Sequence, residues 1–303
     1  MGLDYADPIE ENVPSLTVVC DSTMINFCMT RFVRTIVAAG VMAFASPVAG
    51  ATETLRVATT TSTTNSGLLD YLLPEFTQTS GIVFEIASVG SGQALRMARM
   101  GQVDIVLVNA PVAEEKFVAS GFGLKRATFM KNKFVIVGPP GDPANIANAK
   151  SAREAMELIS SEASRFVSRA DDSGTHKREL SLWHSIYQSP YGDWYYEAGL
   201  GMKSTLSLAN DMQAYTLTDT GTWLSLRSTL NLTICYDLDD PLLQNPYSVI
   251  AVNPARHAAG SIRGDLAERF IAWLTSETAQ SLIAEFRVDG TQLFEPTATQ
   301  GEE

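Results

Sequence analysis

Residues 55–76 read LRVATTTSTTNSGLLDYLLPEF, and this stretch contains the unit from which the fold follows. Its first five residues form a short, mainly apolar run suited to a β-strand. A polar run rich in hydroxyl side chains comes next. The leucines after Gly67 then recur at the i, i+3, i+4 spacing of an amphipathic helix. A strand, a polar loop and a helix are therefore predicted in immediate succession.

The same unit recurs along the chain. Residues 103–108, VDIVLV, form a nearly continuous apolar run, as expected of a strand buried on both faces. Further strands are predicted at 83–87, 133–138, 165–168 and 248–252, and further helices at 94–100, 152–159, 180–187, 262–274 and 276–286. Strands that alternate with helices in this way predict an α/β fold with largely parallel sheets.

The strongest break in the pattern is the turn cluster PPGDP at 139–143. We therefore expect two α/β lobes between which the chain crosses twice. The first lobe is predicted to comprise residues 52–138 and 247–303, and the second lobe residues 139–246. Residues 1–51 are predicted to be a leader that does not belong to the fold.

The leader has the three parts of a secretory signal peptide at 29–51. A basic stretch, MTRFVRT, precedes the apolar run IVAAGVMAFA and a small-residue end, AGA. The apolar run is about half of the ~20 residues that a membrane-spanning helix needs. We expect cleavage after Ala51, and a permanent membrane anchor is the alternative. Because no twin-arginine pair precedes the apolar run, the general secretion route is favoured.

Residues 1–28 carry acidic side chains where a signal peptide would begin with basic ones. We expect that they are an upstream extension and that translation begins at Met29. Initiation at Met24 and a genuine acidic extension are the alternatives.

The charge composition excludes some classes of binding partner. The chain has 22 Lys and Arg against 34 Asp and Glu, and without residues 1–51 it keeps 252 residues and a net charge of −9. Nucleic acid and anionic membranes are excluded as partners because both require a basic footprint. A small anion is not excluded, since a buried site acts through local dipoles.

Cysteine usage agrees with an exported, soluble product. Cys20 and Cys28 precede the predicted cleavage site, so Cys235 alone remains and can form neither an internal disulfide nor a thiolate cluster. No cysteine stands at the cleavage point to carry a lipid. We expect a soluble periplasmic protein.

Three polar loops each join the end of a predicted strand to the start of a predicted helix. They are loop 1 (59–67, TTTSTTNSG), loop 2 (88–93, SVGSGQ) and loop 3 (169–176, RADDSGTH). Helix starts have backbone N–H groups without helical partners and the positive end of the helix dipole, which together favour anions. In open α/β sheets such loops converge at the carboxyl ends of the strands. The three loops therefore predict an anion site.

Each loop also has a plainer interpretation. A Ser or Thr before a helix commonly serves only as its N-cap. Arg169 follows an apolar strand and could present its planar guanidinium to two oxygens of an anion. The alternative for Arg169 is a salt bridge to Asp171 or Asp172.

Enzyme motifs are missing from the sequence. Loop 1 lacks the Gly-Lys-Ser/Thr of a nucleotide P-loop, and there is no Gly-x-Ser-x-Gly elbow. His176, His184 and His257 are too scattered for a zinc motif. Cys235 lies in an apolar run typical of a buried strand. We expect no metal, no cofactor and no catalytic residue.

Four segments resemble the tungstate-binding proteins of tungstate ABC importers: TTTS at 59–62, SVGSGQA at 88–94, SRADDSGTHK at 168–177 and AYTLTD at 214–219. The resemblance runs from about Leu55 to the last helix. It implies a two-lobed fold of periplasmic-binding-protein type II that closes on its ligand like a hinged clamp. It also implies an importer permease as partner, and we expect a monomer.

The resemblance further implies a set of ligand residues for a bare dianion held by hydroxyls, backbone amides and one arginine. By motif position these are Thr60, Thr61, Ser62, Ser91, Arg169 and Thr175, with N–H groups from Ser173 and Gly174. Ala170 departs from the pattern, since a glycine is expected there. Alanine tolerates most backbone conformations except those with positive φ.

The chemistry of the donors bears on which anion binds. A deprotonated tetrahedral dianion only accepts hydrogen bonds, whereas phosphate at neutral pH carries a proton and favours an acceptor. Asp171 and Asp172 are the acceptors near the motifs, so phosphate is the closest rival. Molybdate matches tungstate in shape and charge. An enzyme on this fold, such as an anion transferase or a prephenate dehydratase-like domain, lacks a positioned nucleophile or base.

Overall fold

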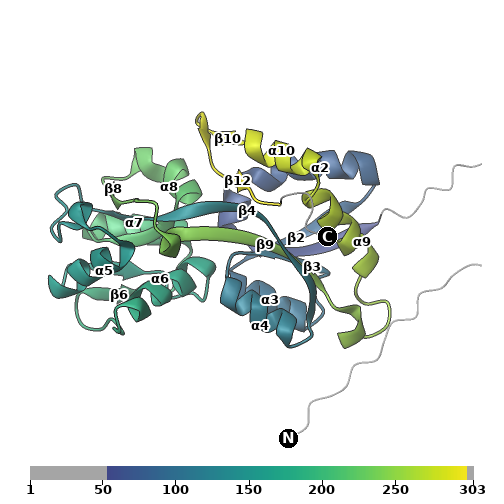
Figure 1. The fold of residues 1–303 in the computed structure, drawn as a ribbon, viewed down its shortest axis with the longest axis horizontal. Helices are drawn as coiled ribbons and strands as arrows, with labels where there is room; N and C mark the ends of the chain where they lie inside the picture. Colours follow the sequence, from purple (N-terminus) through teal and green to yellow (C-terminus); the bar gives the residue numbers. More distant parts are fainter. Residues whose placement is uncertain (1–52, 299–303) are drawn as a thin grey trace, which may run out of the picture. The chain divides into compact units, whose positions relative to one another are not determined.

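The computed structural model describes residues 53–298 (Figure 1). The predicted signal peptide, its cleavage point and the upstream extension lie outside these residues. Two lobes, each with its own buried apolar clusters, are joined by two long strands, β4 (Gly123–Gly138) and β9 (Gln244–Val252). Within the described residues, no helix combines the length and the apolar character needed to cross a membrane.

The first lobe contains β1 (Thr54–Thr60), α1 (Thr61–Asn65), α2 (Leu68–Ser80), β2 (Val83–Val89), α3 (Ser91–Arg99), β3 (Ile105–Val108), α4 (Pro111–Ala119), α9 (Gly264–Leu274), α10 (Glu277–Glu285), β10 (Arg287–Val288), β11 (Thr291–Gln292) and β12 (Glu295–Pro296). Its sheet has the order β12-β4-β9-β3-β1-β2. Helices α2, α9 and α10 lie on one side of this sheet and α3 and α4 on the other (Figure 1).

The second lobe contains α5 (Ala152–Ser161), β5 (Phe166–Ser168), α6 (Gly174–Ser185), β6 (Tyr195–Glu197), α7 (Met202–Met212), β7 (Thr216–Asp219), α8 (Thr220–Leu226) and β8 (Thr233–Tyr236). Short 3₁₀ turns occur in it at Ile146–Asn148, Arg227–Thr229 and Pro241–Leu243, and a further one, Pro254–Arg256, follows β9 in the first lobe. The end of β4 pairs with β7 and β8, and β5 pairs with β6.

Strand pairing is more mixed than the sequence pattern predicted. β1 is parallel to β2 and β3, and β5 is parallel to β6, as expected of strand–helix–strand units. However, β4 is antiparallel to β9, β7 and β8, and β9 is antiparallel to β3. The physical reason is that β4 and β9 carry the chain between the lobes in opposite directions.

The crossing between lobes lies inside β4. Its register with β9 runs to Lys133, which faces Gln244, and from Phe134 onward its partner is β7. Phe134 and Ile136 pack in the core of the second lobe. The predicted lobe limits at 138/139 and 246/247 stay a prediction.

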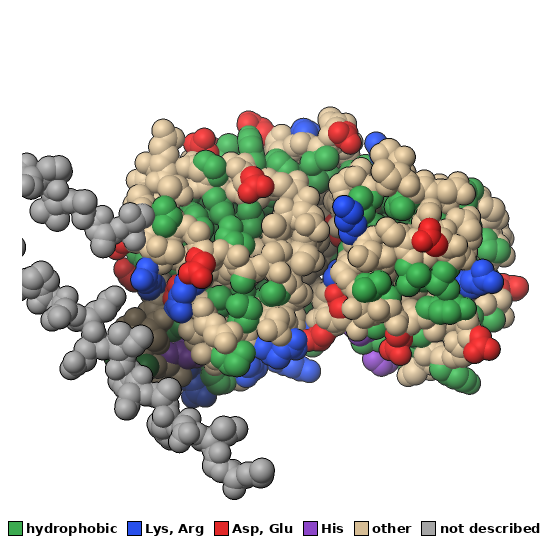
Figure 2. All heavy atoms as spheres, turned by 180° about the vertical axis from the view of Figure 1, so that it is seen from behind, with side chains coloured by type: hydrophobic (Ala, Val, Ile, Leu, Met, Phe, Trp, Pro, Cys, Tyr) green, Lys and Arg blue, Asp and Glu red, His purple; other side chains and the backbone are tan. Residues whose placement is uncertain are grey.

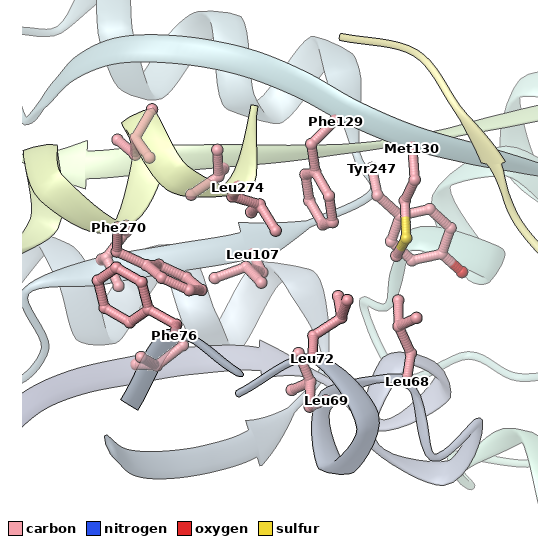
Figure 3. Packing of buried hydrophobic residues seen from close by; sticks show 14 of the residues in the cluster. Leu68, Leu69, Leu72, Phe76, Leu107, Phe129, Met130, Tyr247, Phe270 and Leu274 are labelled. Atoms are coloured by element: carbon pink, nitrogen blue, oxygen red, sulfur yellow. The ribbon is translucent and has the colours of Figure 1, made fainter. Parts of the chain in front are cut away.

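The first-lobe core forms where the leucines of α2 meet the sheet and α9. Leu68, Leu69 and Leu72 point toward Phe129 and Tyr247 from the two long strands (Figure 3). The ring of Tyr247 packs edge-on against Phe294, with centroids 5.6 Å apart. The helix predicted from the leucine spacing is thus confirmed, and the core anchors β4 and β9.

On the face shown in Figure 2, acidic and basic side chains are interspersed, and a furrow separates the two lobes. This distribution agrees with a protein that lacks a broad basic footprint on that face.

Candidate functional site

Loop 1 begins at the carboxyl end of β1 and forms the short helix α1, where the sequence predicted only a loop. Thr60 is the N-cap: its Oγ1 accepts from the backbone N–H of Thr63 at 3.2 Å. The same oxygen lies 3.1 Å from Ser62 Oγ and 2.8 Å from Thr63 Oγ1. Thr60 and Ser62 are buried, and Thr61 is half-buried. Thr60 is thus a cap, as the plainer interpretation held, and part of a buried hydroxyl cluster.

Loop 2 places Ser91 at the first position of α3. Its hydroxyl is fully buried and donates to Asn109 Oδ1 at 2.8 Å, just beyond the end of β3. The helix-start N–H group of Ser91 is therefore available for a further hydrogen bond, while its hydroxyl hydrogen is engaged with Asn109.

Loop 3 follows β5 and carries Arg169, which is 3 % exposed. Its Nη2 forms an ion pair with Asp171 Oδ2 at 2.5 Å, and its Nη1 donates to Thr175 Oγ1 at 3.4 Å. The alternative predicted for Arg169, a salt bridge to a neighbouring aspartate, is therefore realised. However, its Nε is buried without a partner. Since a buried donor left unpaired is costly, this N–H group is available for a hydrogen bond to a ligand.

The start of α6 lies beside this arginine. Ser173 is the N-cap and accepts from the N–H of His176 at 3.2 Å. Its own N–H donates to Asp171 Oδ1 at 3.2 Å, so it is engaged in this structure. Gly174 and Thr175 occupy the first turn, where N–H groups have no helical partner. The backbone N–H groups predicted as donors therefore lie at the start of α6, although the N–H of Ser173 already donates to Asp171.

The structure brings loops 2 and 3 into contact across the two lobes. The N–H of Gly92 donates to the carbonyl of Asp172 at 3.3 Å, and Arg96 pairs with the carboxylate of Asp172 at 2.7 Å. A Cβ on Gly174 would lie 2.2 Å from Asn109 Oδ1. The close approach of α6 to the end of β3 therefore requires a glycine at this position.

Loops 1 and 2 are connected inside the first lobe. Asn109 donates to Asn245 at 2.9 Å, and Asn245 donates to the hydroxyl of Tyr247 at 3.0 Å. The pairing of β1 with β2 also sets Thr60 of loop 1 opposite Val89 of loop 2. Sequence reasoning missed Asn109, Asn245 and Tyr247. The available signal was an asparagine at the end of, or within, an otherwise apolar strand.

Neither aspartate of loop 3 is left as a free acceptor. Asp171 accepts from Arg169 and from Ser173, and Asp172 accepts from Arg96 and Lys177. Burial opposes ionisation of Asp172, but the hydrogen bonds from Lys177 and Arg96 outweigh it and hold its pKa below the ordinary value. Both carboxylates of loop 3 are therefore already engaged with donors of the protein.

Two further titratable side chains, Glu179 and His176, form hydrogen bonds at loop 3 and at the strand end before it. Glu179 is buried and accepts from Ser168, Trp183 and Tyr195, and burial raises its pKa to about 7. The Nδ1 of His176 accepts from the N–H of Asp172 at 3.1 Å. Burial lowers the pKa of His176, which keeps the ring neutral and able to accept.

A small cavity adjoins this arrangement. Its volume is about 130 Å³, and it is lined by residues of both lobes, which include Asn109 and Pro111 on one side and Gly174 and Arg178 on the other. Arg178 donates to the carbonyl of Gln244 at 3.0 Å, and burial lowers its pKa. The space between the lobes thus opens next to the start of α6.

Cys235, which the sequence analysis did not expect to be a nucleophile, lies outside the three loops. Cys235 lies buried in β8, as predicted, and burial raises its pKa to about 12, so its thiol is unreactive. Among residues 53–298, no three His, Cys, Asp or Glu side chains cluster in a way that could hold a metal ion.

Comparisons with known proteins fit this geometry. The family model of the PBP superfamily domain matches residues 46–278. The tungstate-binding protein TupA of Peptoclostridium acidaminophilum is 46 % identical over 80 % of this chain and 86 % of that protein. The chain belongs to the PBP superfamily and, within it, to the family of the TupA proteins.

Two solved structures of this family match closely. The tungstate ABC transporter structure from Geobacter sulfurreducens is 43 % identical over 77 % of this chain and 99 % of its own, with a TM-score of 0.70. The tungstate-binding protein TupA from Desulfovibrio alaskensis G20 is 42 % identical over 82 % and 100 %, with a TM-score of 0.71. The family and the two-lobed fold implied by the resemblance are therefore confirmed.

Proposed function

We propose that this protein is a periplasmic solute-binding protein that captures tungstate, a tetrahedral dianion, between its lobes and delivers it to the permease of an ABC importer. The observation that carries the proposal is Arg169, which is buried beside the start of α6 with its Nε unpaired. An oxyanion would satisfy this donor together with the helix-start N–H groups.

The proposed ligand set is Thr60, Thr61, Ser62, Ser91, Arg169, Ser173, Gly174 and Thr175. Contacts between loops 2 and 3, and the pairing of β1 with β2 that sets loop 1 beside loop 2, support a single shared site. Because the site lies between lobes, ligand binding is proposed to hold them together.

The donor character of the site favours an anion without a proton. The two aspartates considered as acceptors for phosphate are already hydrogen-bonded, Asp171 to Arg169 and Ser173 and Asp172 to Arg96 and Lys177. Phosphate is therefore disfavoured relative to tungstate. Molybdate offers the same shape and charge, and the names of the relatives favour tungstate.

Calorimetric titration of residues 52–303 with tungstate, molybdate, sulfate and phosphate tests the proposal. Tungstate is expected to bind tightly and phosphate weakly. The molybdate titration measures how far the protein distinguishes molybdate from tungstate. Phosphate binding as tight as that of tungstate, or no binding of tungstate, contradicts the proposal. Gel filtration of the same sample tests the proposed monomer.

Export to the periplasm, with removal of residues 1–51, belongs to the same proposal. N-terminal sequencing of the exported protein should begin at Thr52, and an exported chain that keeps Met1 would contradict it.

A further inference from the structure

Asp172, in loop 3 of the second lobe, contacts the first lobe at two points. Its carboxylate accepts from Arg96 Nη1 at 2.7 Å, and its backbone carbonyl accepts from the N–H of Gly92 at 3.3 Å. Both partners belong to α3, which lies on the same side of the long strands as α6 (Figure 1). One residue of the second lobe is therefore bound to one helix of the first lobe through its side chain and through its backbone.

The local structure on both sides favours this contact. A Cβ on Gly92 would lie 2.9 Å from the carbonyl oxygen of Asp172 and closer still to its carboxylate, so a larger residue at position 92 would separate the two loops. Asp172 has a left-handed backbone, with a φ of +60°, and its N–H donates to His176 Nδ1 at 3.1 Å. Aspartate and asparagine adopt this conformation more readily than most other residues.

The ion pair between Arg96 and Asp172 is held in place from each lobe. Gln93 Oε1 accepts from Arg96 Nε at 3.0 Å, and Lys177 donates to the other carboxylate oxygen of Asp172. The side chains of Arg96 and Asp172 are 54 % and 46 % exposed, and such a pair contributes little to folding stability and is screened by salt. However, this pair crosses between the lobes, so opening of the cleft breaks it while each lobe stays folded.

We propose that the ion pair between Arg96 and Asp172 is a latch that slows the release of the bound anion. The inference rests on the proposed function, in which the anion leaves when the lobes separate. The Asp172 carboxylate repels a dianion, so it acts through the first lobe rather than as a ligand. A latch of this kind raises the affinity for every anion that closes the cleft by the same factor, and it leaves selectivity to the ligand residues.

Asp172→Asn separates the latch from a direct effect of charge on the ligand, because the two predict opposite results. If Asp172 acted only by repelling the dianion, loss of its charge would slow release. The latch instead predicts that release of tungstate accelerates by about two- to fivefold, the range of one exposed ion pair, and that the affinity falls by the same factor. Asparagine suits the left-handed backbone, so the carbonyl contact with Gly92 is kept.

Release is measured by loading the protein with isotopically enriched tungstate, adding an excess of natural tungstate, and determining how much enriched tungsten stays bound over time. Calorimetry gives the affinities for tungstate and molybdate, which should fall by the same factor. The difference between parent and variant should disappear at high salt, which screens an exposed pair. Asp193→Asn, at an exposed position of the same lobe, is the matched control and should release tungstate at the parent rate.

Arg96→Gln and the double variant complete the test. Arg96→Gln should accelerate release at least as much as Asp172→Asn does, because it removes the same pair and a positive charge as well. In the Arg96→Gln background, Asp172→Asn should give no further acceleration, since its partner in the first lobe is gone.

The proposal is overturned if Asp172→Asn leaves release unchanged or slows it, or if it accelerates release equally with and without Arg96. Failure of the parent itself to bind tungstate would instead count against the proposed function.

Discussion

Ala170, directly after Arg169, adopts a backbone that alanine disfavours. Its φ is +49°, and its N–H donates to Ser168 Oγ at 3.2 Å, which ties the turn to the end of β5. The family resemblance implied a glycine here, and the positive φ gives the physical reason. The departure in sequence is therefore accommodated by strain in the backbone rather than by a different turn.

Ala170→Gly should relieve this strain and raise the free energy of unfolding by up to about 1 kcal/mol, since glycine adopts positive φ without steric cost. Chemical denaturation measures the change. Ala272→Gly, at an exposed position inside α9, is the matched control and should lower stability by about 1 kcal/mol. A loss of stability in Ala170→Gly comparable to that of the control would contradict the strain.

Glu179 is a buried carboxyl group whose pKa of about 7 lies above its ordinary value of 4.5. Between these two values the folded state binds more protons than the unfolded state, so this group makes the free energy of unfolding fall as pH rises. Its contribution is fully present below about pH 4.5 and is lost as the pH passes about 7.

Glu179→Gln should remove this dependence. Between pH 5 and pH 7.5, the stability of the parent relative to the variant is expected to fall by about 1–3 kcal/mol. Denaturation at both pH values measures the difference, in which the opposite contribution of His176 cancels because both proteins contain it. If the free energies of unfolding of the two proteins change equally between these pH values, Glu179 is ionised throughout and the prediction is wrong.

At the scale of elements, the strands and helices that frame the site could be predicted because their apolar spacing is regular. β1, β2, β3 and the helices α2 and α3 follow the predicted ranges closely. The strand predicted at 133–138 is the second half of β4, whose first half was missed because Lys125, Arg126 and Lys131 interrupt its apolar pattern. Helix α4 was not predicted; it begins at Pro111, and proline is favoured at the first position of a helix.

The candidate site was predictable only where loops carry recognisable motifs. Hydroxyl and glycine runs at helix starts indicated the three loops by their local chemistry, and the family resemblance implied Thr60, Ser91 and Thr175 within them. The asparagines beneath them lie far apart in sequence and meet only because β3, β4 and β9 are neighbours in the sheet. Local patterns do not report such pairing.

The start of α6 approaches the first lobe so closely that Gly174 has no room for a side chain. Gly174→Ala should weaken tungstate binding by at least about tenfold, because the added methyl group holds the lobes apart. The stability of the ligand-free protein should change by less than about 1 kcal/mol, since each lobe can keep its own core.

Gly201→Ala is the matched control for this element. Gly201 precedes α7 in the same lobe, and nothing lies within 4 Å of the Cβ that an alanine would add. Its binding should equal that of the parent. Tight binding by Gly174→Ala would show that the lobes can hold the anion without this close contact.

At the scale of the whole described molecule, the proposed site depends on both lobes. Thr60 and Ser91 come from the first lobe, and Arg169 and Thr175 come from the second. Arg96 and Asp172, together with the bond from Gly92 to Asp172, already join the two sides of the site. The effect of Arg169 on tungstate affinity therefore tests whether the loops of the two lobes form one binding site.

Titration of tungstate into the parent, Arg169→Lys and Arg169→Gln tests this claim most directly. Lysine keeps the charge but lacks the planar fork, so we expect a loss of about ten- to hundredfold, and a larger loss for glutamine. Thr175→Val should cost less, about 1 kcal/mol, since a neutral hydroxyl is lost and the helix-start amides remain. Circular dichroism checks that each variant is folded. If Arg169→Gln binds tungstate as tightly as the parent, the account is wrong and Arg169 serves only as the ion-pair partner of Asp171.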